Sequence, residues 1–126
     1  MKTSLQPTQD ALKNLEEALM ISKPTDLERD GTIQRFEHCY EIMWKAAQRI
    51  LRENEVQAET PKTVFRELGR MGWIQNVEDW LAFQKARNET SHEYGLKLAL
   101  HSYALAKKFL PLAQGLFTIL LEKSRD

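Results

Sequence analysis

The sequence has little cysteine, no net charge and no residue spacing typical of a metal site. Cys39 is the only cysteine among 126 residues, which excludes an intramolecular disulfide and any zinc site built on cysteines. Its place in a helical pattern indicates a small core-facing residue. Lys and Arg together number 18, as do Asp and Glu, so the chain has no net field to gather nucleic acid or anionic lipid. Any binding of a polyanion must therefore be local.

The signatures of several enzyme classes are also missing. There is no phosphate-binding glycine loop, no H-E-x-x-H zinc pair and no glycine elbow around a serine. His38 and His101 have no companion at metal-ligand spacing. Gln, Asp and Glu lie in the amino-terminal stretch, where a signal peptide needs an uninterrupted apolar core. No run of residues approaches the roughly 20 apolar residues of a membrane span. We therefore expect a cytoplasmic protein with no membrane contact, no metal and no cofactor.

What is present fits one helical domain. With 42% hydrophobic and 29% charged residues, a chain of 126 residues can bury one core. Apolar residues recur every three or four positions in five stretches, and no stretch alternates apolar and polar residues as a strand would. The sequence thus predicts a single all-α domain over residues 1–126, an up-and-down bundle of about five helices.

Start and stop signals delimit the first two predicted helices. The first is expected to run for about 15 to 18 residues and to end before Pro24, which forbids continuation. The second is expected over about Asp26 to Asn54 and is the longest. Gly31 weakens its first turn, so we expect its start closer to Thr32.

The remaining helices have similar signals. Thr60 and Pro61 are suited to the cap and the first position of the third helix, and Asn76 can cap the fourth. The apolar pattern resumes at Leu96 for the last helix. Pro111 is expected to interrupt or bend that helix.

Between the last two helices the apolar pattern stops, over the segment KARNETSHEYG. Arg87 and His92 are five positions apart, so on one continuous helix their side chains would point about 140° apart. If the helix ends near Asn88, the chain can turn and bring His92 back toward Arg87. Thr90 or Ser91 would then cap the helix that follows.

Together these two side chains would suit metal-free RNA cleavage. Arg87 is a permanent cation that can grip a phosphate with two hydrogen bonds, and His92 titrates near neutral pH. The histidine would act as general base or acid for the ribose 2′-hydroxyl or the leaving oxygen, while the arginine stabilises charge on the phosphorus oxygens. The hydroxyl of Tyr94 belongs to the same neighbourhood, and Lys85 and Lys97 flank it.

A structural role for the same residues is an open alternative. The R-x4-H spacing arises by chance in many proteins. An arginine at a helix end commonly caps carbonyl groups or pairs with a nearby carboxylate, here Glu89 or Glu93. The spacing by itself does not decide between the two interpretations.

Four segments resemble the HEPN superfamily, and within it the nucleotidyltransferase substrate-binding subunits also known as HEPT toxins. The resemblance runs from about Leu5 to Lys123. Its most specific element is R-x4-H-x-Y, formed here by Arg87, His92 and Tyr94, with Asn88 in the supporting polar position. The four segments are QRFEHCYEIMWKAAQRIL, TPKTVFRELGRMGWI, VEDWLAFQKARNETSHEY and AKKFLPLAQGLFTILLEK.

The resemblance implies a function as well as a fold. It implies a homodimeric, metal-independent endoribonuclease of a toxin-antitoxin pair, with Arg87 and His92 as catalytic residues. A minimal nucleotidyltransferase encoded nearby would silence it by transferring AMP to Tyr94. Bulk and negative charge there would compete for Arg87 and block the RNA backbone.

Two other roles stay open for such a chain. The older family name implies a non-catalytic subunit that binds a substrate or nucleotide for the nucleotidyltransferase. Alternatively, the chain is a degenerate scaffold in which Arg87 and His92 are only structural.

Overall fold

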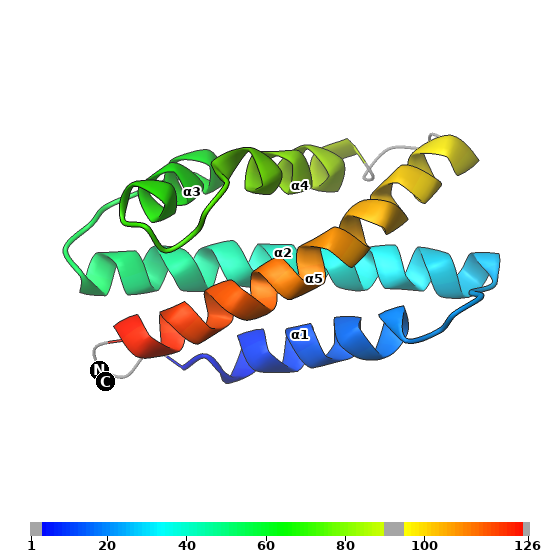
Figure 1. Ribbon diagram of the computed structural model, residues 1–126, viewed down its shortest axis with the longest axis horizontal. Helices are drawn as coiled ribbons and strands as arrows, with labels where there is room; N and C mark the ends of the chain where they lie inside the picture. The colour runs from blue at the N-terminus through cyan, green and yellow to red at the C-terminus, as the bar shows by residue number, and fades with distance from the viewer. Residues whose placement is uncertain (1–3, 90–94, 125–126) are drawn as a thin grey trace.

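The computed structural model describes residues 4–89 and 95–124, and these residues contain helices and no strand. Most of the described chain is α-helical, which confirms the predicted all-α fold. The elements, shown in Figure 1, are α1 (Gln6–Leu19), α2 (Asp26–Glu53), α3 (Pro61–Arg70), α4 (Val77–Glu89) and α5 (Leu96–Lys123).

The start of α2 agrees with the predicted range from about Asp26 and not with the later start near Thr32. The helix begins at Asp26, because Thr25 forms a complete capping box with Glu28. The amide of Glu28 donates to Oγ1 of Thr25 over 3.1 Å, and the amide of Thr25 donates to Oε1 of Glu28 over 2.9 Å. These two bonds satisfy amides at the helix start and outweigh the low helix propensity of Gly31. The expected start near Thr32 was therefore wrong.

The caps predicted for α3 and α4 are confirmed. Thr60 caps α3, its Oγ1 accepting from the amide of Thr63 over 3.2 Å, and Pro61 occupies the first turn. Gly72 follows the end of α3 with φ +77°, a conformation that glycine adopts without strain. Oδ1 of Asn76 accepts from the amide of Glu78 over 3.0 Å at the start of α4.

Helix α5 is not interrupted at Pro111, which was one of the two effects expected of this proline. It runs as one helix through Pro111, because the flanking Phe109 and Ala113 are fully buried and their packing holds the helix together. Its amino-terminal cap position is Gly95, with φ +83°. Thr90 and Ser91, the expected caps, lie outside the described residues.

The two long helices α2 and α5 pack against each other, and the others cover them. In Figure 1, α1 lies along one side of α2, while α3 and α4 follow one another along the opposite side. Helix α5 crosses α2 obliquely. Helix α4 ends and α5 begins toward the same end of the bundle, the end at which α2 starts.

A cluster of aromatic rings fixes α4 on α2 and α5. The ring of Phe83 on α4 lies 5.3 Å from that of Phe109 on α5 and 6.2 Å from that of Phe36 on α2, in edge-to-face contacts. Trp80, one turn earlier on α4, stacks on Phe65 at 5.0 Å. All of these rings are almost fully buried. The last turn of α4 is thereby held over the middle of α2.

By length and composition α5 could cross a membrane, contrary to the expectation from sequence. An 18-residue window within it has mean hydropathy 1.3, and it is the one helix of this kind among the described residues. The core helix of a soluble protein meets the same criterion, and one face of α5 is buried in this bundle. The buried residues of α5 are Ser102, Tyr103, Ala106, Phe109, Ala113, Leu116 and Leu120.

Candidate functional site

The predicted site straddles the end of α4, and the structure describes part of it. Helix α4 ends at Glu89, one residue after the expected end at Asn88. Arg87 and Asn88 lie in its last turn, where Asn88 is exposed. His92 and Tyr94 lie outside the described residues, so their predicted approach to Arg87 stays a prediction.

Arg87 reaches from α4 to α2. It lies one turn after the buried Phe83, on the same side of α4, and this places its guanidinium against α2. Nε of Arg87 lies 3.8 Å from Oε2 of Glu41, and both side chains are about one third exposed, at 35% and 36%. Glu93 and the side chain of Glu89, which the sequence suggests as partners, lie outside what the structure describes. Glu41 is a partner from another helix that the sequence did not suggest.

Glu41 is shared between two cations. Its second oxygen, Oε1, lies 3.3 Å from Nζ of Lys45 one turn further along α2. The contact with Arg87 is therefore the longer of the two. Because Glu41, Arg87 and Lys45 all face solvent in part, water screens these ion pairs and each is individually weak.

A second carboxylate lies one turn before Glu41. Glu37 is half-buried, and its Oε2 is fully buried with no hydrogen-bond partner among the described residues. Burial raises the pKa of this carboxyl, and the positive charge of Arg87 opposes that rise. The cation on α4 is thus close enough to Glu37 to stabilise its charged form.

Tyr40 stands between Glu37 and Glu41 in the sequence of α2. Its ring packs in the core, 5.8 Å from that of Phe65, and its buried hydroxyl has no hydrogen-bond partner among residues 4–89 and 95–124. Burial is the main cause that raises the pKa of this hydroxyl, the charge of Glu41 adds to the rise, and Arg87 counteracts it. The phenol therefore stays neutral at physiological pH.

This arrangement suits anion binding and offers no metal site in the described residues. Arg87 is a permanent cation at the protein surface, held near α2 by acidic side chains, and a phosphate could reach it from solvent. Among the described residues there is no group of three or more His, Cys, Asp or Glu side chains that could hold a metal ion. His38 and His101 are exposed on two different helices.

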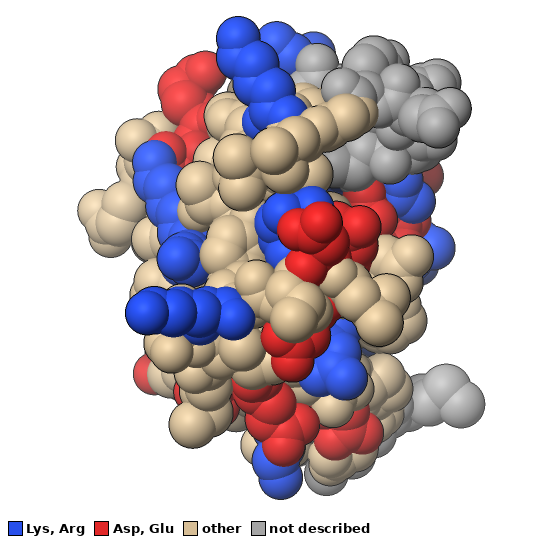
Figure 2. Space-filling view, turned by 90° about the vertical axis from the view of Figure 1, so that its right-hand side faces the viewer, with Lys and Arg blue, Asp and Glu red and all other residues tan. Residues whose placement is uncertain are grey.

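Neither positive nor negative charge dominates the surface around Arg87 (Figure 2). Figure 2 shows the end of the bundle at which α2 starts, where basic and acidic side chains are interspersed with uncharged ones. Lys85 and Lys97, which flank the predicted motif, are both exposed. Leu96 and Leu100 form an exposed apolar pair one turn apart at the start of α5, with 59% and 50% exposure.

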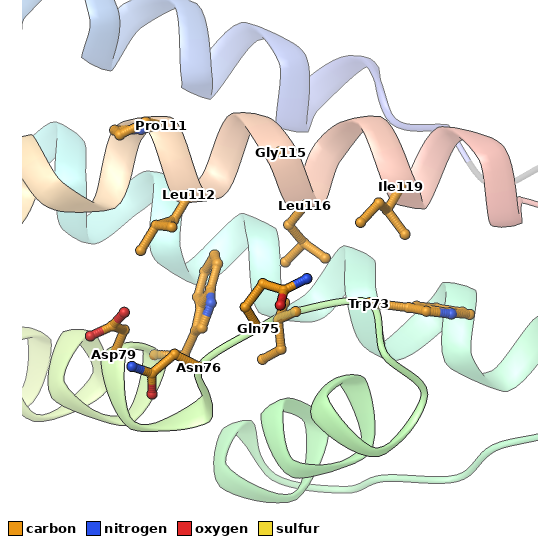
Figure 3. Close-up of a pocket in the computed structure, with 11 residues that line it drawn as sticks. Trp73, Gln75, Asn76, Asp79, Pro111, Leu112, Gly115, Leu116 and Ile119 are labelled. Carbon is orange, nitrogen blue, oxygen red and sulfur yellow. The ribbon is translucent and has the colours of Figure 1, made fainter.

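A separate apolar hollow lies away from Arg87, between α5 and the connection from α3 to α4. In Figure 3, Leu116 of α5 lies over Gln75 and Ile119 lies over Trp73, on opposite sides of this hollow, whose volume is about 230 Å³. Asp79 at its edge is ion-paired with Lys108 over 2.9 Å. The hollow thus carries no unpaired charge at that edge and no evident catalytic group.

Sequence reasoning missed the two carboxylates of α2. A signal was present, because Glu37 and Glu41 are one turn apart and adjoin the apolar stripe of Ile33, Phe36 and Tyr40. Acidic residues beside a core-facing stripe are candidates for pairing with a cation from a neighbouring helix. Which cation they meet depends on how α4 packs.

The chain is similar to one protein family over most of its length. Residues 3–122 match the family described as nucleotidyltransferase substrate binding protein like. A Haemophilus influenzae protein named "Probable ribonuclease HepT" is 34% identical over 85 residues, which make up 64% of this chain and 58% of that protein. The match thus covers less than two thirds of that relative.

Two solved structures have the same fold. One, from Thermus thermophilus, superposes with a TM-score of 0.85 at 31% identity, covering 90% of this chain and 98% of the other. The second, from Haemophilus influenzae, has a TM-score of 0.81 at 28% identity, covering 93% of this chain and 98% of the other. That second protein is described as having the fold of a substrate binding domain of a nucleotidyltransferase.

Proposed function

Because the chain belongs to the nucleotidyltransferase substrate binding protein-like family, as its resemblance to the HEPN superfamily implied, we propose that it is a metal-independent endoribonuclease. The observation that carries the proposal is the placement of Arg87. Its guanidinium is accessible in the last turn of α4, immediately before the segment that contains His92 and Tyr94. A relative named as a probable ribonuclease supports the same activity.

In the proposed reaction the ribose 2′-oxygen attacks the adjacent phosphorus and the 5′-oxygen leaves. His92 accepts the proton of the 2′-hydroxyl and passes it to the leaving 5′-oxygen, so the proton lost by one oxygen is gained by the other. Arg87 stabilises the negative charge that grows on the phosphorus oxygens. The products are a 2′,3′-cyclic phosphate and a 5′-hydroxyl, so the cleavage step consumes no water.

We further propose that a cognate nucleotidyltransferase, encoded nearby, neutralises this cytoplasmic enzyme as the antitoxin of a toxin-antitoxin pair. Transfer of AMP from ATP to the hydroxyl of Tyr94 would form a phosphodiester and release pyrophosphate. The added negative charge would compete with RNA for Arg87. The working form in this proposal is a homodimer, which the exposed Leu96 and Leu100 beside the site would favour.

The ribonuclease proposal is tested by cleavage of a labelled RNA in the presence of a metal chelator. Wild type is expected to cleave, and His92→Ala is expected to lose at least about 100-fold in rate. The matched control is His101→Ala, at an exposed histidine on α5, which should cleave like wild type. Equal rates in wild type and His92→Ala would refute the proposal.

One alternative function has its own support. The solved relative described as a substrate binding domain favours a non-catalytic subunit that presents a substrate or nucleotide to the nucleotidyltransferase. Expression of the chain alone separates the two functions, because a toxin arrests growth and a helper subunit does not. Intact mass after co-expression with the nucleotidyltransferase provides a second test. An AMP adduct that maps to Tyr94 supports the toxin, and an unmodified chain supports the helper.

A further inference from the structure

One carboxylate of α2, that of Glu41, contacts the guanidinium of Arg87 on α4 at the edge of the proposed site, and the carboxylate of Glu37 lies one turn before it on α2. Glu37 and Glu41, here called the acidic pair, are one turn apart on α2. Oε2 of Glu41 lies 3.8 Å from Nε of Arg87. Oε2 of Glu37 is buried, without a hydrogen-bond partner among the described residues, and the charge of Arg87 acts on it. The ribonuclease reaction proposed above uses Arg87 but neither carboxylate.

We propose that the acidic pair positions Arg87. In this proposal the charge of Glu37 keeps the guanidinium near α2, and the phosphate of the substrate displaces Glu41 from the guanidinium. The inference rests on the proposed function, since it assigns Arg87 as the group that binds phosphate. It makes Glu37 and Glu41 positioning residues that act through Arg87.

The contact with Glu41 has the properties of one that a phosphate can displace. A charge-assisted N–H to oxygen hydrogen bond is typically about 2.7 to 2.9 Å long. The contact between Arg87 and Glu41 is 3.8 Å, both side chains are about one third exposed, and Glu41 also contacts Lys45 at 3.3 Å. A phosphate that binds the guanidinium with two hydrogen bonds would compete well against such a contact. Lys45 would then keep Glu41 paired.

Glu37 has the opposite properties. Its buried oxygen is withdrawn from water, so the departure of a nearby cation would leave the ionised form of Glu37 uncompensated. This cost keeps the guanidinium near α2 even when Glu41 releases it. Arg87 would thus exchange one partner for phosphate without swinging freely, which preserves the orientation that charge stabilisation in the transition state requires.

Different kinetic effects follow for the two carboxylates. Glu41→Gln removes a competitor for the guanidinium and also a constraint on it, so we expect KM to fall about threefold and kcat to fall about tenfold. Glu37→Gln removes the constraint alone, so kcat should fall by a similar factor of about ten with KM unchanged. A purely structural role would lower the amount of active enzyme and leave KM unchanged, so the fall in KM separates the two roles for Glu41. For Glu37 the exchange measurement described below separates them.

The matched control is Glu67→Gln. Glu67 forms an ion pair of 2.6 Å with Arg70 on α3, so the substitution removes a carboxylate from another glutamate–arginine pair of the same molecule. Cleavage of a short RNA would be measured for wild type and the three variants, with circular dichroism to confirm that each is folded. Glu41→Gln with the KM of wild type, or with the kinetics of Glu67→Gln, would overturn the proposed role of Glu41. An unchanged kcat in Glu37→Gln would overturn that of Glu37.

A second measurement does not depend on cleavage. In ¹⁵N-labelled protein, exchange of the Nε proton of Arg87 with water reports how firmly the guanidinium is held, and Arg87→Lys identifies its signal. We expect exchange to be several-fold faster in Glu41→Gln and in Glu37→Gln than in wild type or Glu67→Gln. Unchanged exchange at Arg87 overturns the positioning proposal. Wild type that does not cleave RNA overturns the ribonuclease proposal instead, so the two failures are distinguishable.

Discussion

Nε of Arg87, in the last turn of α4, lies 3.8 Å from Oε2 of Glu41, in the middle of α2. This contact joins two helices that are distant in the sequence and places the cation of the proposed site on the side of the bundle covered by α4. It also gives the arginine a partner from another helix, in addition to any that its neighbours in the chain could provide.

Replacing Arg87 by lysine keeps the charge but not the planar fork of hydrogen-bond donors. We expect Arg87→Lys to lose at least about tenfold in kcat/KM for RNA, because an ammonium group cannot bind phosphate with two parallel hydrogen bonds. Arg66→Lys, at an exposed arginine of α3, is the matched control and should cleave RNA at the wild-type rate. Full activity in Arg87→Lys would show that bidentate binding is not needed.

The stability of the protein should depend on pH through Glu37. Burial raises the pKa of this carboxyl above its usual value of about 4.5, so the folded state binds the proton more tightly than the unfolded state. This contribution to stability is present below the unfolded pKa and is lost as the pH rises through the folded one. At pH 7, above the usual pKa of a glutamate, the burial of Glu37 therefore costs the wild type stability that Glu37→Gln does not lose.

We accordingly expect Glu37→Gln to be more stable than wild type at pH 7, with the advantage shrinking as the pH falls to about 4. Urea denaturation at both pH values measures the difference in free energy of unfolding. Glu59→Gln, at an exposed position before α3, should change stability little at either pH. A Glu37→Gln advantage that is the same at both pH values would argue against the burial of this charge. If Glu37→Gln is more stable but cleaves RNA more slowly, the site trades stability for activity.

Phe83 holds the end of α4 in place. Its ring is fully buried and makes edge contacts with Phe36, Trp80 and Phe109. Phe83→Ala is expected to lower the free energy of unfolding by about 3 to 5 kcal/mol, because it opens a cavity where three helices meet. Phe83→Leu keeps most of the volume and should cost less. Denaturant unfolding of both variants measures the difference, and equal losses would contradict the role assigned to the cavity.

Replacing each of two helical glycines by alanine should have different effects on the stability of the protein. An added Cβ at Gly31 on α2 would meet nothing within 4 Å, so Gly31→Ala should stabilise the protein by about 0.5 to 1 kcal/mol through its higher helix propensity. At Gly69 on α3 the added Cβ would overlap Cγ2 of Val77, so Gly69→Ala should be neutral or destabilising despite the same propensity gain. Thermal unfolding of the two variants shows whether each substitution raises or lowers the stability. An equal gain in both would mean that α3 and the start of α4 can separate without cost.

Much of the fold was predictable because its signals are local. Thr60, Pro61 and Asn76 mark helix starts through hydrogen bonds and backbone geometry within a few residues, and the structure confirms all three. Two expectations that the structure contradicts have identifiable causes. The capping box of Thr25 and Glu28 outweighs Gly31, so α2 does not start near Thr32. Pro111 does not interrupt α5, because its buried neighbours keep the helix continuous.

The sequence by itself determined that this chain is an all-α protein, where most of its helices begin and end, and that Arg87 stands at the end of one of them. Only the tertiary structure decided what Arg87 meets on α2. Its contact with Glu41 and its charge interaction with Glu37 arise because the ring of Phe83 is packed against α2 and α5. Such packing sums contacts between residues far apart in the chain, and no short stretch of sequence encodes it.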